Sequence, residues 1–160
     1  MIYCRLFLLF IGLQFSFDGF SQVFSVGAKQ DKRTMFQAAL NFPIVFDNNK
    51  NYDFTIGVDY TSKNHTQPSG LSPQFGFVRY IVDSKYKDFL VSANVQTGYL
   101  FDFNRGMGNQ FRVSPHLYIE YRGFLNCKMG YDYAMPLQKG YPFVSIGIGG
   151  LMMFRHFSIM

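Results

Sequence analysis

The stretch that decides the fold is Phe89–Phe103, which reads FLVSANVQTGYLFDF. Alternate positions from Phe89 onward carry apolar or aromatic side chains apart from Thr97, and the positions between them are mostly polar or small, except Leu90 and Leu100. Because successive side chains of a strand point to opposite faces, this alternation predicts a strand with one apolar and one polar face. The stretch is longer than a typical globular strand of about 5–6 residues and long enough for the about 9–11 residues of a strand that crosses a bilayer. We therefore interpret it as a membrane-spanning strand of a closed barrel.

The N-terminal segment Met1–Ser21 has the features of a secretory signal peptide. Arg5 gives a positive start, Leu6–Leu13 is the apolar core, and Gly19-Phe20-Ser21 supplies the small residues that precede a cleavage site. We expect cleavage before Gln22, which leaves residues 22–160 as one barrel domain. Cys4 would leave with the signal peptide, so the mature chain would hold one thiol, Cys127.

The remaining sequence repeats the same alternation between short turns. It predicts seven further strands, at about Gln22–Lys29, Thr34–Phe46, Tyr52–Thr61, Pro73–Val82, Gln110–Arg122, Asn126–Met135 and Phe143–Phe154. The longest connections follow the third and fifth of the eight strands, and those after the second, fourth and sixth are mostly tighter. Together these features predict an all-β fold, an eight-stranded antiparallel up-and-down transmembrane β-barrel.

The polar faces of these strands carry charges of both signs. We expect an interior polar network formed by Asp53, Asp59, Asp102, Arg112, His116, Glu120, Arg122, Lys128 and Asp132. A soluble lipocalin-like barrel would instead bury the apolar face and expose the polar one. Long strands, aromatic residues at strand ends and the balanced charges of the polar face favour the membrane arrangement. An eight-stranded barrel is just wide enough for side chains to fill it, so a wide channel is not expected.

Arg79 is an exception on the apolar face, between Phe77 and Ile81. It lies close to the predicted turn Asp83–Asp88, where a long basic side chain can reach the membrane surface. A bulge near Gly76 that reverses the register is the alternative explanation.

Over Gln22–Phe154 the sequence resembles the small, porin-like outer-membrane β-barrel proteins of Gram-negative bacteria. The resemblance is carried by the signal peptide, the eight alternating strands, the Tyr and Phe residues at strand ends, and VSIGIGGLMMF (144–154) as a last strand. Phe154 fits the terminal aromatic residue of that family, and Arg155–Met160 follows it. The resemblance implies location in the bacterial outer membrane and contact with membrane lipid, but it assigns no activity.

The first functional hypothesis is a structural or interaction barrel within a larger envelope assembly. Its wall would present the loops Ser62–Ser72 and Asn104–Asn109 to a protein partner. A narrow pore for small solutes is one alternative. A soluble periplasmic binding barrel with a hydrophobic pocket is another.

Signals for chemistry are weak. An enzyme is not expected, although one loop region contains residue types able to perform acyl transfer: His65 with Ser62, Ser69, Ser72 and Asp59. The three histidines have no metal-binding spacing, and no cofactor is expected. Cys127 falls on the apolar face and is interpreted as a small hydrophobic residue.

Composition excludes other classes of protein. Hydrophobic residues make up 48% of the chain and aromatic residues 19%, which is too apolar for a disordered protein. No uninterrupted apolar segment reaches about 18 residues, so no membrane-spanning helix is predicted. Basic residues are scattered apart from Lys32-Arg33, so the formal charge of +5 forms no basic stripe and nucleic acid is not an expected partner.

Overall fold

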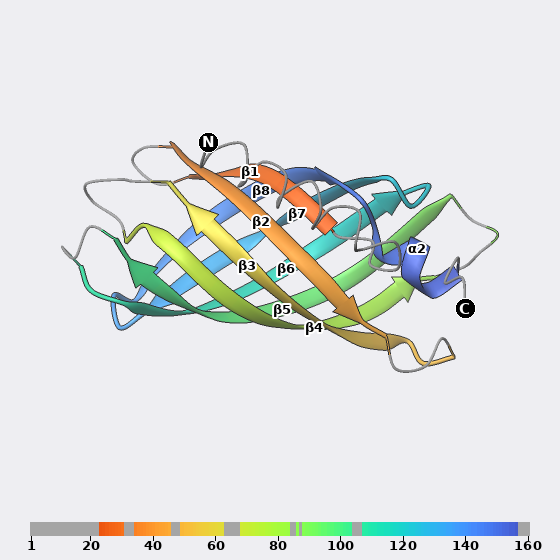
Figure 1. The fold of residues 1–160 in the computed structure, drawn as a ribbon, viewed down its shortest axis with the longest axis horizontal. Helices are drawn as coiled ribbons and strands as arrows, with labels where there is room; N and C mark the ends of the chain where they lie inside the picture. The colour runs from red at the N-terminus through yellow and green to blue at the C-terminus, as the bar shows by residue number, and fades with distance from the viewer. Residues whose placement is uncertain are drawn as a thin grey trace, which may run out of the picture.

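Eight antiparallel strands close into a barrel in the computed structural model (Figure 1). The structure describes residues 23–30, 34–45, 49–62, 68–83, 86, 88–103 and 107–156, so the predicted signal peptide Met1–Ser21 lies outside the described residues. Each strand pairs with its neighbours in sequence, and β1 pairs with β8 to close the sheet. The elements are β1 (Val23–Gln30), β2 (Thr34–Ile44), β3 (Tyr52–Thr61), β4 (Gly70–Val82), β5 (Phe89–Asp102), β6 (Gln110–Tyr121), β7 (Leu125–Met135), β8 (Lys139–Ile148) and α2 (Leu151–His156). The predicted all-β, eight-stranded antiparallel barrel is confirmed.

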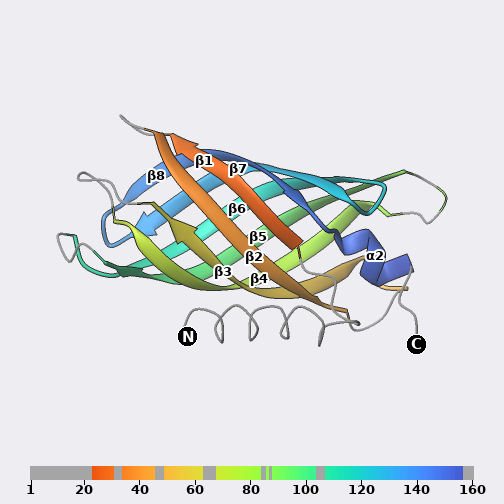
Figure 2. The same cartoon turned by 45° about the horizontal axis from the view of Figure 1, so that its top comes forward.

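The barrel has two different ends. At the helix end β2, β4, β6 and β8 finish and α2 lies across the opening, whereas β1, β3, β5 and β7 finish at the loop end (Figures 1 and 2). Connections 45–51, 83–88 and 122–124 belong to the helix end, and 31–33, 62–69, 103–109 and 136–138 to the loop end. Each end therefore has both longer and shorter connections. The connections after β3 and β5 span 8 and 7 residues and those after β2, β4 and β6 span 7, 6 and 3, so the latter are mostly shorter, as predicted.

Alternate positions of each strand face the outside and the inside of the barrel. Large apolar side chains point outward, such as Phe75 at 50% exposure and Ile146 at 64%. Polar and charged side chains point inward and are buried, including Asp59, Ser92 and Glu120. The polar faces predicted from the sequence therefore form the inside of the barrel, and the apolar faces form its outer wall.

No helix within the described ranges is long and apolar enough to cross a membrane.

The end of β8 differs from the prediction. A last strand to Phe154 was expected, but β8 stops at Ile148 and the chain turns through Gly149, whose φ is 81°. This left-handed backbone conformation favours glycine and breaks the extended path. Continued alternation to Phe154 would place Met152 outward with Ile146 and Ile148; this is wrong, because Met152 is buried at the helix end.

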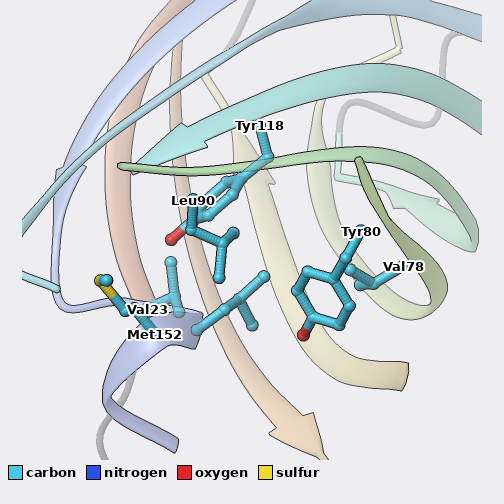
Figure 3. Packing of buried hydrophobic residues seen from close by; sticks show 7 residues of the cluster. Val23, Val78, Tyr80, Leu90, Tyr118 and Met152 are labelled. Carbon is cyan, nitrogen blue, oxygen red and sulfur yellow. The ribbon is translucent and has the colours of Figure 1, made fainter. Parts of the chain in front are cut away.

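An apolar cluster fills the interior beneath α2 (Figure 3). Its members come from four strands (β1, β4, β5 and β6) and the helix: Val23, Val78, Tyr80, Leu90, Tyr118, Leu151 and Met152. Leu90, which interrupts the polar positions of its strand, has an exposure of 0% and belongs to this cluster. Burial of these side chains stabilises the position of α2 over the opening.

Arg79 remains on the outer wall. It is exposed and pairs in register with Tyr52 of β3 and Ala93 of β5. The register irregularity of β4 lies between Tyr80 and Val82, so the predicted bulge near Gly76 is wrong. Arg79 is close to the helix end, where a long side chain can extend past the apolar wall.

Candidate functional site

Four buried charges from four strands meet in the barrel interior. Lys29 Nζ lies 3.2 Å from Asp59 Oδ2 and 2.8 Å from Asp132 Oδ2. Arg112 Nη1 lies 2.8 Å from the same Asp59 oxygen, and its Nη2 pairs with Asp132 Oδ2. Two cations thus alternate with two carboxylates across β1, β3, β6 and β7. We call these four residues the charge cluster.

Hydrogen bonds complete the charge cluster. Lys29 Nζ donates to Thr61 Oγ1 at 3.0 Å, and Ser114 Oγ donates to Asp132 Oδ1 at 2.7 Å. Arg112 Nε donates to the same Asp132 oxygen at 3.0 Å. Buried ions are tolerated only when they are paired and hydrogen-bonded, so the charge cluster acts as a connected unit.

A second polar layer surrounds His116. Its imidazole lies 3.3 Å from Asn94 Nδ2 and 3.0 Å from the Ser114 carbonyl oxygen. Lys128 Nζ donates to Ser25 Oγ at 3.3 Å and lies 6.0 Å from the centre of the Tyr118 ring. These contacts give His116 a structural role as a hydrogen-bond partner between strands.

Arg155 of α2 connects the helix to the barrel wall. Its guanidinium lies 2.7 Å from both Asp53 Oδ2 and Asp83 Oδ2 and donates to the Lys50 carbonyl oxygen at 2.6 Å. It also lies 4.1 Å from the centre of the Tyr80 ring. A guanidinium presents several donors in a fixed plane, which suits this set of acceptors.

Glu120 holds the start of α2. Its carboxylate accepts a hydrogen bond from the backbone N–H of Met152, with N–O distances of 3.1 and 3.2 Å to the two oxygens, and another from Tyr118 Oη at 2.9 Å. A Cβ added at Gly150 would collide with this carboxylate. The lack of a side chain at Gly150 therefore allows the helix to approach Glu120 closely.

At the loop end, Asp102 ties two connections together. Its carboxylate accepts hydrogen bonds from the backbone N–H of Ser69 at 3.3 Å and of Met107 at 3.1 Å. The backbone N–H of Asp102 donates to Asn109 Oδ1 at 3.1 Å. The described residues of the loops Ser62–Ser72 and Asn104–Asn109 are thus joined at their bases. The first loop is shorter than predicted, because β4 begins at Gly70.

The structure buries eight of the nine residues predicted for the interior network: Asp53, Asp59, Asp102, Arg112, His116, Glu120, Lys128 and Asp132. Arg122 is the exception and the prediction for it is wrong. It sits in the turn after β6 with φ of 53°, its side chain is 65% exposed, and it lies 3.5 Å from Asp88. Positive φ at both Arg122 and Gly123 allows a tight hairpin turn that carries the arginine out of the strand.

Arg155 was missed by sequence reasoning. It follows the expected last strand and was assigned no partner. A possible signal was a single basic residue after an apolar run, which is too common to identify a buried ion pair.

The interior has little free space. Cavities of about 20 Å³ beside His116 and about 10 Å³ beside Lys29 each have room for about one water molecule. Of the residues considered for acyl transfer, Asp59 belongs to the charge cluster and Ser72 is buried inside the barrel, whereas His65 lies outside the described residues. Among the residues described, no three His, Cys, Asp or Glu side chains are grouped for a metal ion.

Comparison of the chain with protein-family models, with curated proteins and with solved structures found no match.

The contacts of Arg155 predict that its replacement by alanine will loosen α2. Tyr80 Oη still donates to Asp53 at 2.9 Å, so one buried carboxylate keeps a partner, while both ion pairs of Arg155 are lost. We expect local opening of α2 to become easier by about 1–3 kcal/mol. Amide hydrogen exchange should accelerate in residues 151–156 and remain unchanged in mid-strand residues of β6. Unchanged exchange in α2 would contradict the role of Arg155.

Proposed function

We propose that this protein is a small β-barrel of the bacterial outer membrane with a structural or interaction role. The observation that carries the proposal is the sidedness of the barrel: its outer wall is apolar and its interior is charged. In water this arrangement would expose a large apolar surface. In lipid the same wall faces hydrocarbon, and closure of the sheet leaves no unpaired strand edge.

Aromatic pairs on the outer wall are consistent with this environment. Tyr99 and Phe101 lie toward the loop end, with ring centres 5.2 Å apart. Phe89 and Tyr121 lie toward the helix end, with ring centres 5.0 Å apart. Aromatic residues near both ends of a barrel suit the two interfaces of a bilayer.

The filled interior argues for an interaction role over transport. The charge cluster and the apolar cluster beneath α2 occupy the interior at different heights. A pore for small solutes would require a continuous opening, and no observation favours one. A soluble barrel with a hydrophobic pocket would require the opposite sidedness.

The loop end offers a surface for a partner. Asp102 fixes the bases of two connections, which supports a role for Ser62–Ser72 and Asn104–Asn109 in presenting a defined surface to an envelope protein.

Fractionation and chemical labelling test the membrane location. We expect the protein in the outer-membrane fraction, with a heat-modifiable shift on gels. In a Cys127→Ser background, single cysteines at positions 91, 93 and 95 should react with a probe dissolved in lipid and not with a water-soluble thiol reagent. Those at 92 and 94 should not react with the lipid probe, because Ser92 and Asn94 are buried inside.

Recovery in the soluble periplasmic fraction would contradict the membrane location. Strong aqueous labelling at 91, 93 and 95 in membranes would do the same.

A further inference from the structure

An apolar groove crosses the outer wall near the helix end. Its volume is about 550 Å³, and it spans β6, β7, β8 and β1. Short side chains form part of its lining, at Val26 and Cys127, among longer ones such as Phe24, Leu125 and Ile148. Cys127 pairs in register with Ile119 of β6 and Ile146 of β8, so it lies within the paired wall of the barrel.

A cation lies next to this groove. The ring of Tyr121 contributes to the lining, and the Arg122 guanidinium lies 5.2 Å from the centre of that ring. The partner of Arg122 is Asp88 at 3.5 Å, and both side chains are more than half exposed. Such a surface ion pair contributes little, so the guanidinium can bind another anion. Guanidinium groups bind phosphate through paired hydrogen bonds.

We propose that the groove binds one acyl chain of a phospholipid whose phosphate is bound by Arg122. The apolar groove and the adjacent exposed cation match the tail and head of a single lipid molecule. A hollow in a wall that faces hydrocarbon must be filled, because an empty space loses dispersion contacts. This inference rests on the proposed membrane location.

Lipid retention by the purified full-length protein tests the inference. The protein is extracted in detergent, mixed with phosphatidylglycerol and analysed by native mass spectrometry. We expect one retained lipid for each wild-type chain. Arg122→Ala should reduce apparent affinity about tenfold, which corresponds to the loss of about 1.4 kcal/mol. Arg79→Ala is the matched control, because Arg79 is also exposed near the helix end but lies on β4, which contributes no residue to the groove, and the variant should retain the lipid.

The wild-type thiol gives a second measurement that needs no variant. Phosphatidylglycerol should slow the reaction of Cys127 with a maleimide, relative to protein in detergent alone. The effect should be weaker in Arg122→Ala.

Equal lipid retention in wild type, Arg122→Ala and Arg79→Ala, or unprotected Cys127, would overturn the lipid site. A second protein chain bound at the groove without lipid would also overturn it. These outcomes are distinct from failure of the proposed function, which would appear as wild-type protein in the soluble fraction.

Discussion

Replacing Asp132 with alanine is expected to destabilise the barrel by about 3–5 kcal/mol. The substitution leaves Lys29 and Arg112 with Asp59 as the remaining carboxylate of the charge cluster. One positive charge in the interior is then uncompensated, and a buried unpaired charge is costly. Urea unfolding in lipid vesicles, followed by the heat-modifiable gel shift, would measure the loss.

Two further variants make this prediction specific. Asp88→Ala removes a carboxylate from the exposed pair with Arg122 and should cost less than about 1 kcal/mol. The double variant Lys29→Ala with Asp132→Ala restores the charge balance and should cost less than the sum of the two single changes. If Asp132→Ala were as mild as Asp88→Ala, the charge cluster would not exist as described.

The second large effect is expected at Val95, which lies mid-strand on the outer wall with 43% exposure. It pairs in register with Phe77 and Pro115, both far from the strand ends. In a membrane, Val95→Arg would place a charge in hydrocarbon at a cost of about 2–4 kcal/mol. In water the same change would place a charge on an exposed surface at almost no cost. Its effect on assembly, measured as the folded fraction in the outer membrane, therefore discriminates between the two environments.

Ile81→Arg is the control for depth. Ile81 is also exposed on the outer wall, but it is the second-last residue of β4 at the helix end. The cost of an arginine falls to about 0–1 kcal/mol near a membrane interface. Equal tolerance of Val95→Arg and Ile81→Arg would contradict the membrane environment.

The sequence predicts the number of strands, their pairing with neighbours in the chain, and which face of each strand points inward. All three depend on the same alternation of apolar and polar residues. The inward positions of Asp59 and Asp132 follow from parity alone. Their convergence on Lys29 and Arg112 does not, because it depends on the tilt and stagger of strands around the closed barrel. The position of a residue in the alternation predicts whether its side chain points inward or outward, but not which side chains of other strands it contacts.

The errors occur where the chain leaves the alternating pattern. Arg122 keeps the parity of β6, but the left-handed turn removes it from the strand. Met152 keeps the parity of β8, but the chain bends at Gly149 and the side chain enters the apolar cluster. The apolar and polar alternation of a sequence can continue past the residue at which the backbone ends the strand. The orientations of Arg122 and Met152 therefore could not be predicted from the alternation.

The charge cluster also bears on the order of biogenesis. The hydrogen bond from Lys29 to Asp132 joins residues 103 positions apart, on the first and the seventh of the eight strands. Until β7 is in place, the first strand carries a cation that lacks one of its two carboxylates. A partially assembled sheet is therefore penalised electrostatically, and the penalty is relieved only when the strands up to β7 have joined the sheet. This favours a single concerted closure over a stable half-built intermediate.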